Sequence, residues 1–450
     1  MRAHSPPHNG QDFDPAEQND SPAGHSTVVR PKALKLNMMR WVDHWVGLPV
    51  CFGLGLLAVV ARKVLPLRNR TITGKHPLAV FKFFGLGSIL QATPLLRAIR
   101  ERYPETRLVF VTFEGNESLL RRLDICTDLR IIRTSSIVWF AHDVMREIIW
   151  LWWHRVEGVV DLEFFSKFST LLSFLSRAPV RIGFHLNDFW RSSLLTTPVY
   201  FNYFRHISDV YQQAARRLGV EITDRQLSRL AVDDDAIQSA KKVLHHHGWR
   251  DDDPLLGMNV NAGDMSLERR WPMEHFVFLI EALLQRHQDL RVVLTGSPDE
   301  ESYVRCVYDH ISKPCQDRVI VVAGQWSLGA FIAGLSLFDG FVTNDSGPMH
   351  LAAAQEVPMV SLWGPGRPEF YAPNVVHHEY IYEDYPCSPC LYMFTSFEGM
   401  WCHHEGWCMQ AVPPEKVLDA TERMLAETAR RRRSGENAHP ETLTGGEKDT

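Results

Sequence analysis

The segment from Thr343 to Ala354 (TNDSGPMHLAAA) has the residue types needed to bind a phosphate group and a sugar. It follows an apolar run at 337–342, which predicts a short buried strand, and it leads into a helix rich in Leu and Ala. A helix that begins at the end of a strand directs backbone N–H groups and the positive end of its dipole at one point. Asp345 and His350 flank this turn, so a polar sugar could be held beside the phosphate.

A second strand that ends in a turn, here called a strand exit, follows closely in the sequence. The apolar run 358–362 precedes Trp363-Gly364-Pro365. Two such exits in quick succession predict neighbouring loops at the carboxyl edge of one parallel sheet, which is where α/β proteins bind ligands.

Two further exits lie earlier in the chain. The run 255–260 ends at Asn261-Ala262-Gly263, and a helix with Pro272 in its first turn begins soon afterwards. Paired arginines between a strand exit and a helix start can hold a diphosphate as it leaves, although an exposed surface pair has the same pattern. The other exit, after strand 290–295, has short side chains that could border a base or ribose. These exits add six candidate donor-binding residues, Asn261, Gly263, Arg269, Arg270, Thr295 and Gly296.

Four of the eight cysteines form a group with the spacing C-x₂-C-x₁₁-C-x₅-C. Four thiolates with one close pair suit a tetrahedral structural zinc. Reduced cysteines that pack as small apolar groups are the alternative. The candidate ligands are Cys387, Cys390, Cys402 and Cys408.

The elements that must position these residues alternate between apolar runs and helical periodicity. Strand 78–84, helix 89–103 and strand 107–113 form a βαβ unit, which implies a parallel sheet. A second series of this kind begins at residue 255. The sequence therefore predicts an α/β protein with two doubly wound, Rossmann-like domains and a cleft between them. The predicted domains are 75–235 and 254–425.

The ends of the chain have a different composition. Residues 1–37 and 430–450 are polar and lack apolar periodicity, which is typical of disorder. Within 38–70, the stretch Trp45–Ala61 carries no charge and is at the lower length limit for a membrane span. We expect an anchor that lies in or dips into the membrane; a buried helical hairpin is the alternative.

The overall composition is that of a globular protein. The chain has 450 residues, of which 45% are hydrophobic and 22% charged, so it can form two full cores. A net charge of −5 gives no reason to expect a nucleic-acid partner.

Taken together, these segments resemble glycosyltransferase family 9, the ADP-heptose:lipopolysaccharide heptosyltransferases and their relatives. The resemblance spans roughly residues 77–425. It implies a GT-B fold, an inverting mechanism without a catalytic metal, and an ADP-sugar bound mainly by the second domain. The matching segments are 82–96, 261–263, 270–272, 295–296, 343–354 and 362–365.

The resemblance also implies roles for individual residues. Asp345 would hold sugar hydroxyls, and the N–H groups of Ser346 and Gly347 would face the diphosphate together with His350. Arg269 matches a basic residue beside the phosphates.

The chain departs from the family in its first Gly-rich turn. The family has an aspartate directly after the second glycine, proposed as the base, whereas this chain has Ser88 after Gly87. A serine hydroxyl has no useful basicity near pH 7. Asp161 and Glu163 are the candidate replacements, because two residues at this spacing on an extended chain point to the same side. They could instead cap the following helix; His185 and Glu114 are weaker candidates.

These observations predict an inverting glycosyltransferase at the cytoplasmic face of a bacterial inner membrane. Its donor would be a nucleotide-diphosphate sugar, with ADP-heptose favoured, and its acceptor a lipid-linked saccharide. No cofactor is required for catalysis. A non-catalytic sugar-nucleotide or glycan-binding scaffold and a GT-B-fold nucleotide-sugar epimerase are the alternatives.

Overall fold

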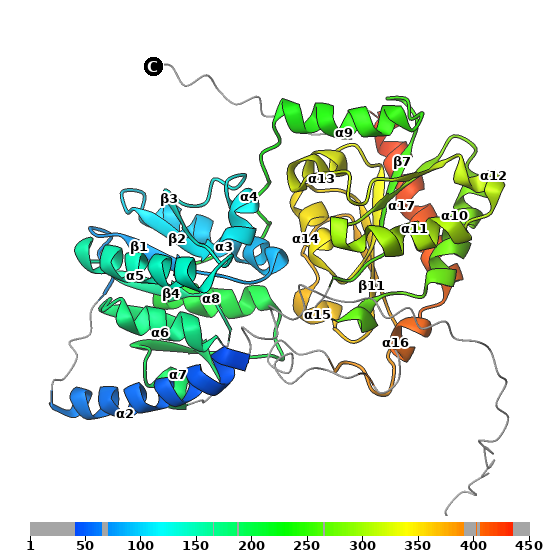
Figure 1. The fold of residues 1–450 in the computed structure, drawn as a ribbon. Coiled ribbons are helices and arrows are strands. Elements are labelled where there is room, and N and C mark those ends of the chain that lie inside the picture. Colours follow the sequence, from blue (N-terminus) through cyan, green and yellow to red (C-terminus); the bar gives the residue numbers. More distant parts are fainter. Residues whose placement is uncertain are drawn as a thin grey trace, which may run out of the picture.

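Two six-stranded sheets, each with all of its strands parallel, form the framework of the protein (Figure 1). The computed structural model describes residues 41–64, 71–164, 166–186, 189–263, 266–390, 402 and 406–434, without the side chains of 61–64. The predicted tail at 1–37, residues 435–450 of the predicted tail 430–450, and residues 38–40 and 65–70 of the predicted anchor segment lie outside the described residues.

The first sheet has the strand order β3-β2-β1-β4-β5-β6. Side chains alternate between its faces, so Val80 joins one apolar cluster and Ala79 joins another. Helices α3, α4 and α8 cover the first face, and α5 and α6 cover the second. The strands are β1 (Leu78–Phe81), β2 (Leu108–Phe113), β3 (Asp128–Ile132), β4 (Gly158–Asp161), β5 (Val180–His185) and β6 (Thr197–Tyr200); the helices are α3 (Leu86–Arg102), η2 (Glu114–Asn116), α4 (Glu117–Leu120), α5 (Ile137–Trp153), α6 (Lys167–Leu175), α7 (Phe189–Ser192) and α8 (Ile207–Arg217).

The second sheet has the strand order β12-β11-β10-β7-β8-β9. Helix α9 packs against α13, and α17 packs against α10 and the central strands. The strands are β7 (Leu255–Asn259), β8 (Arg291–Thr295), β9 (Val319–Val321), β10 (Gly340–Asn344), β11 (Met359–Trp363) and β12 (His378–Tyr382); the helices are α9 (Asp234–His246), η3 (Leu267–Arg269), α10 (Met273–Arg286), η4 (Pro298–Glu300), α11 (Glu301–His310), α12 (Lys313–Gln316), α13 (Leu328–Leu335), α14 (Gly347–Ala354), α15 (Pro368–Tyr371), α16 (Trp407–Gln410) and α17 (Pro414–Ser434).

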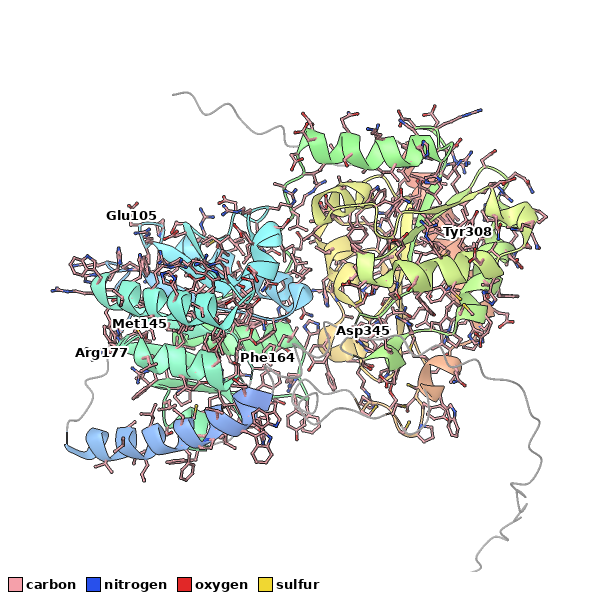
Figure 2. All side chains as sticks on the ribbon, in the orientation of Figure 1. Glu105, Met145, Phe164, Arg177, Tyr308 and Asp345 are labelled. Carbon is pink, nitrogen blue, oxygen red and sulfur yellow. The ribbon has the colours of Figure 1, made fainter. Side chains whose placement is uncertain are left out.

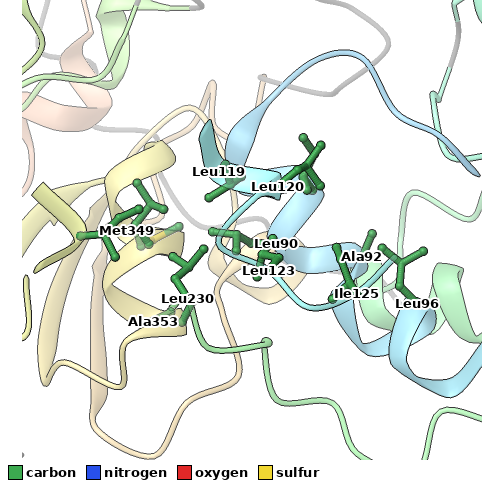
Figure 3. Close-up of a cluster of buried hydrophobic side chains, with 14 of the residues drawn as sticks. Leu90, Ala92, Leu96, Leu119, Leu120, Leu123, Ile125, Leu230, Met349 and Ala353 are labelled. Atoms are coloured by element: carbon green, nitrogen blue, oxygen red, sulfur yellow. The ribbon is translucent and has the colours of Figure 1, made fainter. Parts of the chain in front are cut away.

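The two lobes meet through helices α3 and α14. Leu90 of α3 and Met349 of α14 belong to the same buried apolar cluster, in which Leu230 of the connecting segment also takes part (Figure 3). Across this junction the Gln91 side chain donates a hydrogen bond of 2.8 Å to the carbonyl of Tyr371. The apolar core therefore continues from one lobe to the other.

A long helix precedes the first lobe and lies along its side (Figure 1). It consists of η1 (Asp43–Gly47) and α2 (Leu48–Val64), and its window Asp43–Val60 is long and apolar enough to cross a membrane, by length and composition only. Asp43 accepts hydrogen bonds from the backbone N–H groups at the start of α6, and Cys51 is buried. A single helix with most of its apolar side chains exposed replaces the buried hairpin considered above.

The predicted α/β architecture with two parallel sheets is confirmed. The two strands that the sequence did not reveal are the edge strands β6 and β12. Pro198 lies inside β6, and proline is confined to sheet edges because it has no N–H to donate. At the other end of the chain, α17 extends to Ser434 and includes the arginines from Arg430 onward that composition had assigned to a tail.

Candidate functional site

The predicted phosphate-binding turn lies at the carboxyl edge of the second sheet, at the amino end of α14. A polar network between β7 and β10 fixes this turn. The Asn259 side chain donates to the Ser346 hydroxyl at 3.0 Å and to the Asn261 carbonyl at 3.1 Å, and Asn344 Oδ1 accepts from the Trp271 N–H at 3.0 Å. Within the described chain no side chain caps α14, so its first amide groups remain for a ligand.

Several buried polar atoms in this region have no hydrogen-bond partner among the described residues. They are both side-chain polar atoms of Asn261, Nδ1 of His350 and Nε of Arg269. Buried polar groups are nearly always hydrogen-bonded, because desolvation without a partner is costly. Unsatisfied donors and acceptors at one sheet edge are the features expected of a site that binds a polar ligand.

Arg269 is held at the start of this turn. Its guanidinium donates to the carbonyls of Asp345 at 2.7 Å and Ala262 at 2.6 Å, and it lies 3.8 Å from the Asp345 carboxylate. Burial raises the pKa of Asp345, while Arg269 opposes this effect. The positive charge is therefore fixed beside the α14 turn, as a diphosphate site requires.

The other predicted donor residues lie nearby but differ in their contacts. The Arg270 guanidinium stacks 3.8 Å from the centre of the Tyr303 ring. The Thr295 hydroxyl donates to the Met258 carbonyl at 3.1 Å. A β-carbon at Gly296 would lie 3.0 Å from Val304 and 3.4 Å from the Asn261 amide nitrogen. The small residue thus leaves room beside Asn261, whereas Gly263, with φ +69°, provides a turn.

His350 is the point at which the second lobe touches the Gly-rich turn of the first. A β-carbon at Gly87 would overlap the His350 ring, lying 3.1 Å from its Cγ. Burial lowers the pKa of His350 to about 3, with smaller contributions from His378, His206 and Arg269. The imidazole is therefore neutral near pH 7 and acts as a hydrogen-bonding group there.

Ser88 lies in the family's aspartate position, but its hydroxyl stabilises its own turn. It donates to the carbonyls of Phe84 and Gly85, each at 2.9 Å. This local bonding accounts for the hydroxyl without any role in proton transfer.

Asp161 is fully buried at the end of β4. Its carboxylate forms an ion pair of 2.9 Å with Arg191, which is also fully buried, and accepts from the Ser169 hydroxyl at 2.9 Å. Burial raises the pKa of Asp161 to about 6, although the Arg191 charge opposes the shift. These contacts favour a structural role.

Glu163 joins β4 to the Gly-rich loop. Its Oε1 accepts from Lys82 Nζ at 3.1 Å and from the backbone N–H groups of Phe83 at 2.6 Å and Phe84 at 2.9 Å. All of its carboxylate hydrogen bonds within the described chain go to this one oxygen, which leaves Oε2 available. Glu163 and Asp161 therefore have different partners, despite their spacing of two.

The four grouped cysteines are free thiols, and Cys408 lies near enough to the other three for each of them to affect its pKa. Burial first, and then Cys390, Cys387 and Cys402, raise the pKa of the Cys408 thiol to about 12. The Cys390 N–H donates to the Pro365 carbonyl at 3.0 Å. Within the described ranges, however, no group of three or more His, Cys, Asp or Glu residues has the geometry to hold a metal ion. The aromatic residues between Cys390 and Cys402 lie outside those ranges.

Sequence reasoning missed three residues that organise this region. Lys82 and Arg191 are buried cations that hold the two carboxylates, and His206 bridges the lobes by a contact of 2.9 Å to the Ala372 carbonyl. Lys82, a charge directly after an apolar strand, was a usable signal. Arg191 and His206 gave none, because their partners are distant in the sequence.

The topology of the two sheets defines a protein of GT-B-like architecture. A heptosyltransferase of Escherichia coli, described as ADP-heptose LPS heptosyltransferase II, has a similar fold, with a TM-score of 0.61 at 18% identity over 78% of this chain and 99% of the other. The model of glycosyltransferase family 9 (heptosyltransferase) matches residues 166–400, more than half of the chain. The chain belongs to this family.

Curated relatives match at moderate identity. The lipooligosaccharide heptosyltransferase 2 of Campylobacter jejuni is 27% identical over 172 residues, 38% of this chain and 51% of the relative. The lipopolysaccharide heptosyltransferase 3 of Escherichia coli K12 is 23% identical over 375 residues, 76% of this chain and 96% of the relative. The chain thus spans about half of the first of these and nearly all of the second.

Proposed function

We propose that this protein is an inverting glycosyltransferase that moves a sugar from a nucleotide diphosphate to a lipid-linked saccharide, and that ADP-heptose is the donor and the lipopolysaccharide core the acceptor. The observation that carries the proposal is the group of unsatisfied polar atoms on Asn261, His350 and Arg269 beside the uncapped start of α14. Family membership supports the sugar chemistry, and the names of the relatives support heptose.

The donor's diphosphate would accept hydrogen bonds from the amides of Ser346 and Gly347. Arg269 would stabilise the negative charge that develops as the diphosphate leaves. Asp345 would bind sugar hydroxyls, because its carboxylate lies beside this arginine at the mouth of the turn. Neutral His350 would donate or accept a hydrogen bond without adding charge.

Glu163 is the better candidate for the base that replaces the family's aspartate. Its Oε1 is bonded to the backbone just before the Gly-rich turn, and its Oε2 accepts no hydrogen bond within the described chain, whereas Asp161 is paired with Arg191. In the proposed reaction the acceptor hydroxyl gives its proton to Glu163 and attacks the anomeric carbon. The bond from that carbon to the diphosphate breaks, and ADP leaves. No metal is needed for this step.

The exposed helix α2 supports membrane attachment at the cytoplasmic face. Trp45, Phe52 and Leu57 are each more than half exposed. Its other side packs against the first lobe, because a β-carbon at Gly47 would contact Lys167 and Gly55 faces Ser193. This one-sided packing favours a helix that lies in the membrane surface over one that crosses it. Loss of binding to neutral vesicles in a Phe52→Ser/Leu57→Ser variant would support this attachment.

A structural zinc at Cys387, Cys390, Cys402 and Cys408 is also proposed. Burial first, and then the neighbouring thiols, raise the pKa of Cys408, and a bound cation would favour the thiolate form of all four cysteines. The metal would tie the loop after β11 to α16 and take no part in transfer.

Incubation of the protein with ADP-heptose and membrane glycolipid tests the main proposal. ADP release that requires both substrates is the expected result. ADP binding without release would favour the non-catalytic scaffold, for which Ser88 is the supporting feature. Release of a rearranged sugar without an acceptor would favour the epimerase.

A further inference from the structure

An open pocket of about 710 Å³ lies at the amino edge of the first sheet. It is formed where the chain enters β1, β4 and β5, so it lies at the amino edge of the first sheet, whereas the donor site is proposed at the carboxyl edge of the second sheet. Its polar lining includes Thr71, His76, Arg155, Ser176 and Arg177. We propose that this pocket binds the phosphodiester head group of an anionic membrane lipid.

The two arginines of this pocket are not neutralised by acidic residues of the described chain. Neither Arg155 nor Arg177 forms an ion pair with a carboxylate of the described chain, and both are exposed. They follow α5 and α6 directly, so two successive helix ends bring positive charge to one place. A guanidinium with several N–H donors matches the geometry of phosphate oxygens.

The backbone at both arginines is left-handed, with φ +48° at Arg155 and φ +58° at Arg177. This position after a helix usually has glycine, because other residues adopt this conformation at a cost in free energy. Arginine thus occupies two positions at which glycine would adopt the left-handed backbone at a lower cost in free energy. Such a cost is consistent with a function for the two side chains.

The acidic residue that lines the pocket does not neutralise these arginines. Glu157 accepts hydrogen bonds from the backbone N–H groups of Thr73 at 2.6 Å and Gly74 at 3.0 Å, so both of its oxygens are engaged. Two arginines against one glutamate give the described lining residues a formal charge of +1, with histidine counted as neutral, which suits an anion.

The rim of the pocket is aromatic. Trp152 lines it and is 42% exposed, the adjacent Trp153 is 82% exposed, and the Arg177 guanidinium lies 4.3 Å from the Trp152 ring. Exposed apolar residues continue along α5 through Ile149 and Met145. Tryptophan prefers the interface between lipid and water. The Trp152 N–H donates to the Leu175 carbonyl at 2.6 Å, so it is the exposed ring that would meet the lipid. A lipid head group fits this rim better than a soluble anion does.

The pocket also lies close to the exposed helix α2. Helices α5, α6 and α2 are neighbours in one layer (Figure 1), and α2 ends seven residues before Thr71. Figure 2 shows Arg177 and Met145 on the side of the first lobe that faces away from Asp345. Stable attachment of a peripheral protein usually needs an apolar contact and a second signal such as basic charge. The pocket supplies the second signal for α2.

This lipid site rests on the membrane attachment proposed above, and vesicle binding tests it separately from sugar transfer. The full chain is sedimented with vesicles of pure phosphatidylcholine and with vesicles that contain a quarter phosphatidylglycerol. We expect tighter binding to the anionic vesicles. In Arg155→Gly/Arg177→Gly that preference should fall about 30-fold, since each basic side chain near an anionic surface contributes about fivefold. Glycine suits the left-handed backbone, so the variant should fold.

Arg216→Ala/Arg217→Ala is the matched control. These arginines are exposed in the last turn of α8, on the opposite face of the sheet, and removing them changes the net charge equally. An equal loss in this control, or no preference for anionic vesicles in the unchanged protein, overturns the proposal. The proposal is also overturned if inorganic phosphate without lipid raises the melting temperature of the unchanged protein and this shift is lost in Arg155→Gly/Arg177→Gly. ADP release with a detergent-solubilised acceptor should be the same in both double variants as in the unchanged protein. If the unchanged protein releases no ADP in this assay, the result counts against the proposed function and not against the lipid site.

Discussion

Gly87 of the first lobe lies against the imidazole of His350 in the second lobe, with no room for a β-carbon between them. These two residues belong to the two turns that the family likeness assigns to acceptor and donor. Their contact means that the distance between the turns is set by the absence of a side chain at Gly87.

Gly87→Ala should therefore force the two turns apart. We expect turnover to fall about 100-fold, because a displacement near 1 Å has effects of this size on catalysis. ADP affinity should change little, since the proposed ADP contacts belong to the second lobe. Gly115→Ala is the control, because a β-carbon there meets nothing within 4 Å. Equal turnover in the two variants would show that the Gly87 contact does not matter for transfer.

Asn261→Ala should separate ligand binding from stability. Both polar atoms of the Asn261 side chain are buried and have no partner among the residues that the structure describes, so its removal should leave the free energy of unfolding of the ADP-free protein unchanged or higher. ADP affinity, measured by calorimetry, should fall about tenfold or more. Asn259→Ala gives the contrast, because its side chain is bonded to Ser346 and Asn261; it should lower stability by about 1–3 kcal/mol. A marked destabilisation by Asn261→Ala would contradict the assignment.

The two carboxylates after β4 should respond differently to removal of their charge. Glu163→Gln keeps an acceptor for the backbone amides of Phe83 and Phe84 and should fold, but turnover should fall about 100-fold or more if Glu163 is the base. Asp161→Asn leaves Arg191 buried without its partner and should destabilise the fold by about 3–5 kcal/mol. Urea unfolding and ADP-release rates distinguish them. Full turnover in Glu163→Gln would remove this residue as the base.

Stability should decrease in mild acid because of the buried histidines. The pKa of His350 is lowered to about 3 by burial, below the 6.5 of an unfolded chain, so the unfolded chain binds the extra proton first. The contribution is fully present above pH 6.5 and is lost at about 1.4 kcal/mol per pH unit as the pH falls toward 3. His206 and His378, whose pKa values burial also lowers, act in the same direction.

Urea unfolding at pH 7 and pH 5 measures this effect. His350→Gln should lose about 2 kcal/mol less than the unchanged protein between these pH values. The exposed His246→Gln should lose as much as the unchanged protein. A loss in His350→Gln equal to that in the unchanged protein would mean that His350 does not titrate as described.

The cysteine group predicts one zinc per chain in the purified protein. Cys402 accepts a hydrogen bond from the Gly406 N–H at 3.3 Å, and a thiolate ligand to zinc is commonly stabilised by such bonds. Cys402→Ser should abolish the bound metal and loosen α16, while Cys306→Ser, which lies outside the group, should retain it. A metal content well below one per chain in the unchanged protein ends the proposal.

The sequence by itself determined the two-sheet architecture, because apolar runs and helical periodicity alternate in a regular order. It also predicted the strand, turn and helix of the proposed donor site, since β10, the small residues after it and α14 are contiguous in the chain. The edge strands β6 and β12 were missed because an edge strand needs less apolar character than a central one.

Only the tertiary structure decided which polar residues are satisfied and which are free. Asp161 and Glu163 have the same chemistry and nearly the same place in the sequence, yet Arg191 and Lys82 give them different surroundings. The contact of Gly87 with His350 joins segments that are far apart in the chain, and the shared pocket of Arg155 and Arg177 depends on how two successive helices pack on the sheet. Burial and partners come from packing between such segments, and no local pattern of residues encodes them.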